Sequence, residues 1–107
     1  MDEDAQNVMM EMQQLQQNLQ EVMQQSEQTE NELNGVKKAL KELDGDNGQV
    51  YKAVGDLMVA KDRDEMEDEL KERKGDLNAR LKSLNRKEEK LQDKLEETQG
   101  KISQNFQ

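Results

Sequence analysis

The side chains that most often carry out covalent or acid–base chemistry are missing from this sequence. It has no histidine and no cysteine, so the commonest general base and the thiolate nucleophile are both lacking. Neither the G-x-x-x-x-G-K-[ST] phosphate loop nor the G-x-S-x-G turn occurs. The 25 acidic and 16 basic residues follow helix-surface spacing, where a solvated face is the usual role. The sequence therefore predicts no enzyme, no catalytic residue and no cofactor.

A short acidic loop, Asp44-Gly45-Asp46-Asn47-Gly48, has the composition of a calcium site. An EF-hand needs glycine at the sixth loop position and glutamate at the twelfth, and no register here supplies both. We interpret the loop as a turn that ends a helix, because glycine is favoured just past the last helical residue. No metal site is predicted.

The chemistry that the sequence does offer is apolar binding, concentrated in residues 49–61. Two short β-branched runs flank Gly55-Asp56, a pattern typical of a β-hairpin whose two-residue turn has glycine first. Side chains alternate along a strand, and here neither face is polar. An isolated hairpin is marginal in water, and its edges favour pairing with another chain. We predict that the hairpin assembles with those of other subunits, through Val50, Tyr51, Val54, Gly55, Leu57, Met58 and Val59.

Two long amphipathic segments must position this hairpin. Residues 8–43 and the segment from residue 64 to the end carry apolar residues four and three apart, which is typical of a coiled coil. The second segment slips once, from Leu77 to Leu81, which changes the winding without ending the coil. The predicted seam positions are Val8, Met12, Leu15, Leu19, Val22, Ser26, Thr29, Leu33, Val36, Leu40 and Leu43, then Met66, Leu70, Arg73, Leu77, Leu81, Leu84, Glu88, Leu91, Leu95, Thr98 and Ile102.

The two segments fit each other when folded back antiparallel. Facing residue numbers then add up to 109 or 110 throughout, so that Leu43 meets Met66, and no level pairs two polar residues. We predict a mainly α fold, a single subunit over residues 1–107 with helices at 1–44 and 62–107 and the turn and hairpin at 45–61. Gly35 and Gly75 would share one level, either as a joint or close backbone approach or, as we favour, as tolerated helical glycines.

Composition narrows the class and the partners. Only 31% of the residues are hydrophobic against 38% charged, which is too little for a globular core but enough for a narrow helical seam. The net charge is −9, with eight acidic and no basic residues in the first 34. Neither nucleic acid nor an anionic membrane surface is an expected partner. An acidic N-terminus and the lack of a long apolar run indicate a soluble cytoplasmic protein.

The order of elements and several local sequences resemble the β-class subunit of prefoldin, in its archaeal form. The most specific parts are Lys38-Ala39-Leu40, Leu43-Asp44, Val50-Tyr51-Lys52-Ala53-Val54-Gly55 and Leu57-Met58-Val59, with one hairpin rather than two. The resemblance implies a hetero-hexamer with α-class subunits and other β subunits, whose hairpins form a β-barrel. It implies an ATP-independent holdase that captures unfolded polypeptides with its coiled-coil tips and delivers them to a group II chaperonin.

The resemblance also gives a role to the surplus apolar residues near both chain ends. Met9 and Met10 lie outside the seam, and flexible methionines suit apolar binding to varied partners. The client-binding residues would be Val8, Met9, Met10, Met12, Ile102 and Phe106. The main alternative is a structural coiled-coil spacer or tether with an oligomerising hairpin. A membrane-associated helical bundle is disfavoured, because no anchor or basic face is present.

Overall fold

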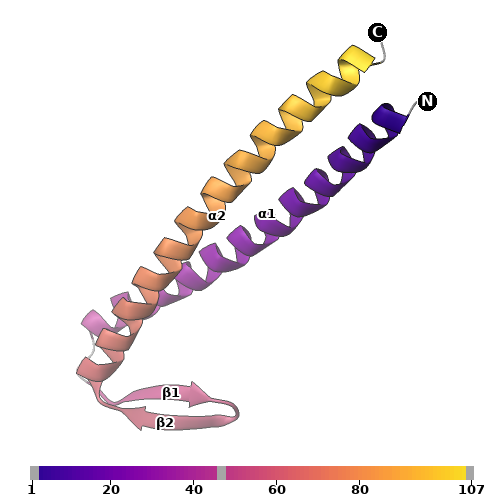
Figure 1. Cartoon of the computed structure of the whole chain (residues 1–107). Coiled ribbons are helices and arrows are strands. Elements are labelled where there is room, and N and C mark those ends of the chain that lie inside the picture. The colour runs from indigo at the N-terminus through magenta and orange to yellow at the C-terminus, as the bar shows by residue number, and fades with distance from the viewer. Residues whose placement is uncertain (1–2, 46–47, 106–107) are drawn as a thin grey trace. The chain divides into compact units, whose positions relative to one another are not determined.

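The computed structural model describes residues 3–45 and 48–105, which form two long helices with a β-hairpin between them. Helix α1 (Glu3–Asp44) leads into strands β1 (Val50–Val54) and β2 (Leu57–Lys61), and helix α2 (Arg63–Asn105) follows. Figure 1 shows α1 and α2 running in opposite directions, with the antiparallel hairpin inserted between them in the chain. The predicted mainly α fold with a central hairpin is confirmed.

The chain divides into two compact units, and each helix contributes to both. The end unit contains Met1–Gln28 and Leu81–Gln107, and the hairpin unit is Thr29–Arg80. The boundary crosses α1 after residue 28 and α2 before residue 81, two positions that the predicted antiparallel register places at one level. It also coincides with the slip in the α2 pattern, directly before Leu81.

The apolar seam provides the core of both units. Every predicted seam position of α1 is buried or half-buried, and Val22 and Leu33 are each only 3% exposed. On α2, Leu77 is also 3% exposed and Leu84 is buried. The seam extends one step further toward the N-terminus than predicted, because Ala5 is buried as well, three positions before Val8.

Shared hollows between the helices confirm the predicted register inside each unit. In the end unit, Asn18 and Val22 of α1 line one hollow together with Lys87 and Leu91 of α2. In the hairpin unit, Ala39 and Leu43 line another with Met66 and Leu70. The antiparallel register therefore holds at both levels.

The polar seam positions behave differently from one another. Thr98 is buried, and its hydroxyl donates to the Lys94 carbonyl oxygen at 2.8 Å, a bond within one helix turn. The buried Ser26 Oγ has no hydrogen-bond partner in the described part of the chain. Placing Arg73 in the seam was wrong: its side chain is exposed, and its guanidinium binds Glu32 across the helix pair at 2.7 Å. A guanidinium gains more from a carboxylate at the rim of the seam than from burial among leucines.

The two helical glycines are not sites of close helix approach. A side chain added at Gly35 or Gly75 would meet no atom within 4 Å. Both residues are exposed on their helices. This result agrees with the favoured interpretation, tolerated glycines in otherwise regular helices.

Candidate functional site

The β-hairpin is the first candidate site, and its register fixes which side chains share a face. Val50 pairs with Lys61, Lys52 with Val59, and Val54 with Leu57. Because side chains alternate along each strand, the intervening pairs point to the opposite face. One face carries Val50, Lys52, Val54, Leu57, Val59 and Lys61, and the other carries Tyr51, Ala53, Met58 and Ala60.

Most of the predicted assembly residues are exposed in the isolated chain. Leu57 and Met58 are 69% and 67% exposed. Tyr51, Val54 and Val59 are exposed too, whereas Val50 is half-buried. Within the described residues the sheet has only these two strands, so both outer edges lack a ladder partner. Large apolar side chains and two free edges on one small ribbon are features that a further strand would satisfy.

The turn of the hairpin needs its glycine. Gly55 has φ = +61°, and no other described residue has a positive φ. A two-residue turn with positive φ only at its first central position is type II′, whose twist matches that of the flanking strands. The prediction of Gly55 as the first turn residue is confirmed.

Two lysines of the hairpin share one carboxylate of α2. Lys52 Nζ lies 3.3 Å from Glu69 Oε2, and Lys61 Nζ lies 3.6 Å from Glu69 Oε1. The hydrogen bond from Lys52 and its positive charge, with the charge of Lys61, hold the pKa of the Glu69 carboxyl below its ordinary value. Glu69 therefore links both strands to the helix pair, beside an open hollow of about 390 Å³ under β1.

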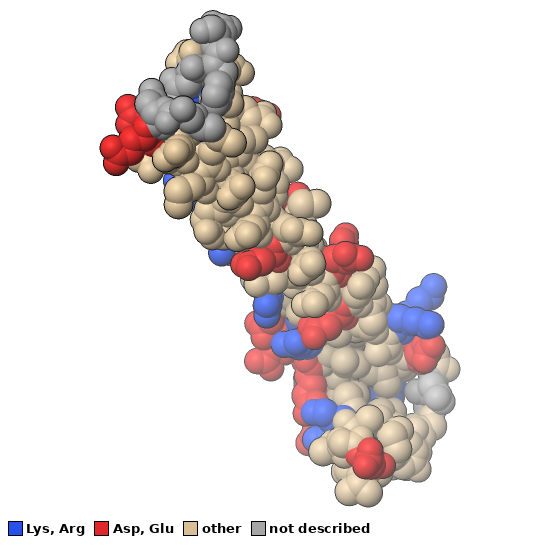
Figure 2. Space-filling view, turned by 90° about the vertical axis from the view of Figure 1, so that its right-hand side faces the viewer, with Lys and Arg blue, Asp and Glu red and all other residues tan. Residues whose placement is uncertain are grey.

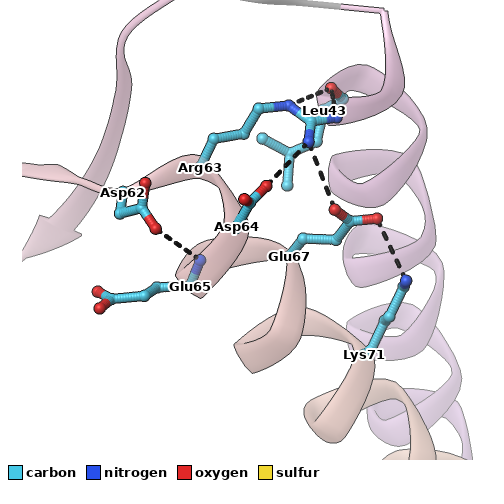
Figure 3. A network of polar contacts seen from close by, with 7 residues as sticks. All are labelled: Leu43, Asp62, Arg63, Asp64, Glu65, Glu67 and Lys71. Carbon is cyan, nitrogen blue, oxygen red and sulfur yellow. Dashed lines mark hydrogen bonds and ion pairs between the residues drawn. The ribbon is translucent and has the colours of Figure 1, made fainter.

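A second group of polar contacts joins the C-terminal end of α1 to the start of α2 (Figure 3). The Arg63 guanidinium donates to the Leu43 carbonyl oxygen through both Nε, at 3.1 Å, and Nη2. Its Nη1 lies 3.4 Å from Glu67 Oε2, and the other Glu67 oxygen lies 3.2 Å from Lys71 Nζ. A cation on the last carbonyls of a helix satisfies unpaired acceptors and opposes the negative end of the helix dipole.

Asp62 makes the N-terminal cap of α2. The backbone N–H of Glu65 donates to Asp62 Oδ2 at 3.4 Å, and that of Met66 donates to the Asp62 carbonyl at 3.0 Å. Asp62 and Arg63 are neighbours, so one short segment caps the start of α2 and the end of α1 (Figure 3). Together these contacts fix where the hairpin leaves the helix pair.

The second candidate site is the apolar surface near the chain ends, in the end unit. Met9 and Met10 are 40% and 67% exposed, as the sequence predicts for residues outside the seam. Val8, Met12 and Ile102 are half-buried, as expected for seam residues at the end of a two-helix pair. The remaining predicted client-binding residue, Phe106, lies outside the described residues.

Sequence reasoning did not find three of the residues that shape these surfaces. Nothing in the spacing of Arg63 or Glu69 points to Leu43 or to the two lysines, because these contacts join segments through the fold. Met23, which is 51% exposed, was overlooked although its position directly after the seam residue Val22 marks it as outward-facing.

The described part of the chain holds neither a metal-binding cluster nor a membrane-spanning helix. No group of three acidic, histidine or cysteine residues there is placed to hold a metal ion. Asp46 and Asn47 of the acidic loop lie outside the described residues. No described helix is long and apolar enough to cross a membrane.

Comparison with known proteins places this architecture in a family. The family model described as "Prefoldin subunit" matches residues 6–107. The chain belongs to the prefoldin subunit family. Within it, the similar proteins are β-class subunits of archaea, as the single hairpin predicts.

The curated relatives differ in how far they align. "Prefoldin subunit beta" of Methanopyrus kandleri is 53% identical over 74 residues, covering 64% of this chain and 62% of the relative. That of Pyrococcus abyssi is 40% identical over 79 residues, covering 72% and 68%. The chain thus aligns with less than two thirds of the first relative's length.

A solved structure matches almost the whole chain. The crystal structure of the prefoldin β subunit from Thermococcus strain KS-1 has a TM-score of 0.86 and 38% identity. The match covers 97% of this chain and 93% of that one. Helices and hairpin are therefore arranged as in a known β subunit.

Proposed function

We propose that this chain is a β subunit of an ATP-independent holdase chaperone. In this proposal it assembles in the cytoplasm with α-class prefoldin subunits and further β subunits into a hetero-hexamer. The assembled protein captures unfolded polypeptides and passes them to a group II chaperonin. The observation that carries the proposal is the family match over residues 6–107, which includes both helices and the hairpin.

The hairpin supports the assembly part of the proposal. Leu57 and Met58 are about two-thirds exposed on opposite faces of a ribbon with two free edges. Strand addition at such edges gains main-chain hydrogen bonds, and burial of a leucine or methionine contributes about 1.5–3 kcal/mol. A barrel of hairpins would satisfy both needs at once. The alternative, a structural spacer, is not favoured, because the family match spans the hairpin and both helices.

The chain ends support the client-binding part. Met9 and Met10 present flexible apolar side chains on the surface of α1, outside the seam. Such side chains repack around different partners, which suits the capture of unfolded chains of unrelated sequence. No nucleotide site is part of this mechanism, since capture by apolar contact requires no phosphate chemistry.

The test uses the chain mixed with an α-class prefoldin subunit and a chemically unfolded model protein diluted into buffer. Light scattering measures aggregation of the model protein, and analytical ultracentrifugation measures the mass of the chaperone. The triple variant Met9→Ser, Met10→Ser, Phe106→Ser should assemble normally but suppress aggregation less well. The matched control places serine at three polar positions of α2, Gln92, Gln99 and Gln104. Unchanged suppression by the methionine and phenylalanine variant would contradict the assignment.

A further inference from the structure

One face of α1 in the end unit carries neither an acidic nor a basic residue over four helical turns. Its members are Met9, Gln13, Gln16, Gln20 and Met23, which we call the amide stripe. At 3.6 residues per turn they fall within an arc of about 80° and extend along about 21 Å of helix. The stripe flanks the seam and does not overlap it.

The stripe is open to solvent and is not used within the described chain. All five residues are exposed, and Met23 is 51% exposed although it lies far from the N-terminus. In the described part of the chain, no hydrogen bond occupies the side-chain amide of Gln13, Gln16 or Gln20. By contrast, Gln14 lies off the stripe and donates to Asn18 Oδ1 at 3.2 Å.

The charged residues of α1 around the stripe are all acidic. The first basic residue of α1 is Lys37. Among the described residues, none of Glu11, Glu21 and Glu27 forms an ion pair, and the ion pair that joins α1 to α2, between Glu32 and Arg73, lies in the hairpin unit. Figure 2 looks onto the side on which α1 lies in Figure 1 and shows few charged residues over the end unit.

An open hollow beside the stripe contains one carboxylate. Gln17, Gln20 and Gln24 line it together with Glu21, and its volume is about 230 Å³. Glu27 lies one turn beyond Met23 along the line of the stripe. A bound segment with apolar side chains on the methionines and ammonium groups near these two carboxylates would match the surface in both polarity and charge.

We propose that the amide stripe binds an extended polypeptide segment in which apolar and cationic side chains alternate. The proposal rests on the proposed holdase function and names the class of client segment that this part of the arm prefers. Glutamine amides both donate and accept hydrogen bonds, so they can pair with the backbone of any extended chain. At about 3.3 Å per residue, a segment of six or seven residues spans the distance from Met9 to Met23.

The test measures binding of a fluorescent seven-residue peptide, alternating valine and lysine, to the full-length chain by fluorescence anisotropy. A second peptide has glutamate in place of lysine. The stripe variant is Gln16→Lys with Gln20→Lys and Met23→Ser. The matched control, Gln14→Lys with Gln28→Lys and Gln92→Ser, adds the same charge on another side of α1 and places the serine on the exposed surface of α2. Circular dichroism checks that all three proteins have the same helix content.

The stripe variant should bind the lysine peptide about tenfold more weakly, because like charge replaces amides beside the lost methionine. The control should stay within about twofold, and the glutamate peptide should bind about tenfold more weakly than the lysine peptide. Equal losses in stripe and control variants would overturn the proposal, because a general charge effect would then suffice. The proposal would also be overturned if the stripe variant changed only the self-association of the chain and not peptide binding. The amide stripe would then be occupied by a second copy of the chain.

Failure of this proposal and of the holdase function can be told apart. If the assembled chaperone suppresses aggregation and the stripe variant binds the lysine peptide like the wild type, only the stripe assignment is wrong. If the wild-type assembly does not suppress aggregation at all, the proposed function itself fails.

Discussion

The hairpin unit and the end unit are built from the same two helices, yet their polar contacts differ. In the hairpin unit, ionic contacts join separate elements: Arg63 binds the end of α1, Arg73 binds Glu32, and Glu69 binds two lysines of the hairpin. In the end unit, the described residues form no ion pair between α1 and α2. There the apolar seam packs the two helices together.

The proposed function makes a different structural demand on each unit. In the proposed function the hairpin adds to other hairpins, which requires a defined exit from the helix pair, and directional contacts between charged groups would supply it. A surface that must accept varied partners gains from uncharged, flexible side chains such as methionine and glutamine. The same coiled-coil pattern therefore occurs in one unit with ionic contacts between its elements and in another whose described helices form no ion pair with each other.

The largest effect is expected from charging the hairpin. Leu57→Lys with Met58→Lys places one cation on each apolar face. Each lost contact should weaken assembly with an α-class prefoldin subunit by about 2 kcal/mol or more, or about thirtyfold. Analytical ultracentrifugation measures the loss. Two lysines introduced on the helix surface, at Ser83 and Gln92, should leave assembly intact, and equal loss in both proteins would argue against the hairpin as the interface.

The next largest effect is expected from shortening one buried leucine in each unit. Leu33→Ala in the hairpin unit should lower the free energy of unfolding by about 2–3 kcal/mol, because Leu33 is only 3% exposed. Leu15→Ala in the end unit, where the leucine is 7% exposed, should cost less. Urea unfolding at one protein concentration measures both variants. If Leu15→Ala lowered the free energy of unfolding more than Leu33→Ala, the exposed fractions of the two leucines would not explain the difference.

Removal of the Arg63 contacts tests the junction. Arg63→Met keeps the aliphatic stem but leaves the Leu43 carbonyl without its donors. The expected loss is about 1–2 kcal/mol in urea unfolding, since hydrogen bonds to a charged group are stronger than neutral ones. Arg63→Lys, which retains the charge but not the forked geometry, should recover part of it. No loss in either variant would show that water replaces the guanidinium without cost.

A stabilising change is expected in the end unit. Ser26→Ala removes a buried hydroxyl that has no partner in the described part of the chain. The gain should be about 1 kcal/mol beyond that of Ser83→Ala, the exposed control, which corrects for the better helix propensity of alanine. Thermal unfolding of both variants gives the comparison. Equal gains would mean that Ser26 is hydrated in solution.

The smallest effect concerns the Glu69 link and pH. The folded-state pKa of Glu69 is lowered, so its contribution is present above the ordinary pKa of a glutamate and is lost as the pH falls through the folded value. Wild type should therefore exceed Glu69→Gln in stability near neutral pH, and the difference should vanish in acid. Glu72→Gln, an exposed change on the same helix that leaves both lysine contacts in place, is the matched control. A pH-independent difference would rule out the charge as its source.

Much of this architecture was predictable because it is local or periodic. Spacing of four and three predicted which α1 residues lie in the seam, and Gly55 predicted the turn, since a type II′ turn has glycine at its first central position. Arg73 was misplaced because a heptad pattern assigns positions without regard to where a guanidinium finds its carboxylate. The Lys52, Lys61 and Glu69 group was missed for the same reason, as its members meet only after the hairpin folds beside α2.

The sequence by itself determined the two helices, the turn between the strands and the antiparallel register, because hydrophobic spacing and glycine conformation act over a few residues and repeat along the chain. Only the tertiary structure decided how the hairpin is tied to the helices and which surfaces stay open. Ion pairs such as Glu69 with Lys52 depend on side chains brought within about 4 Å by folding, and no sequence spacing encodes that distance.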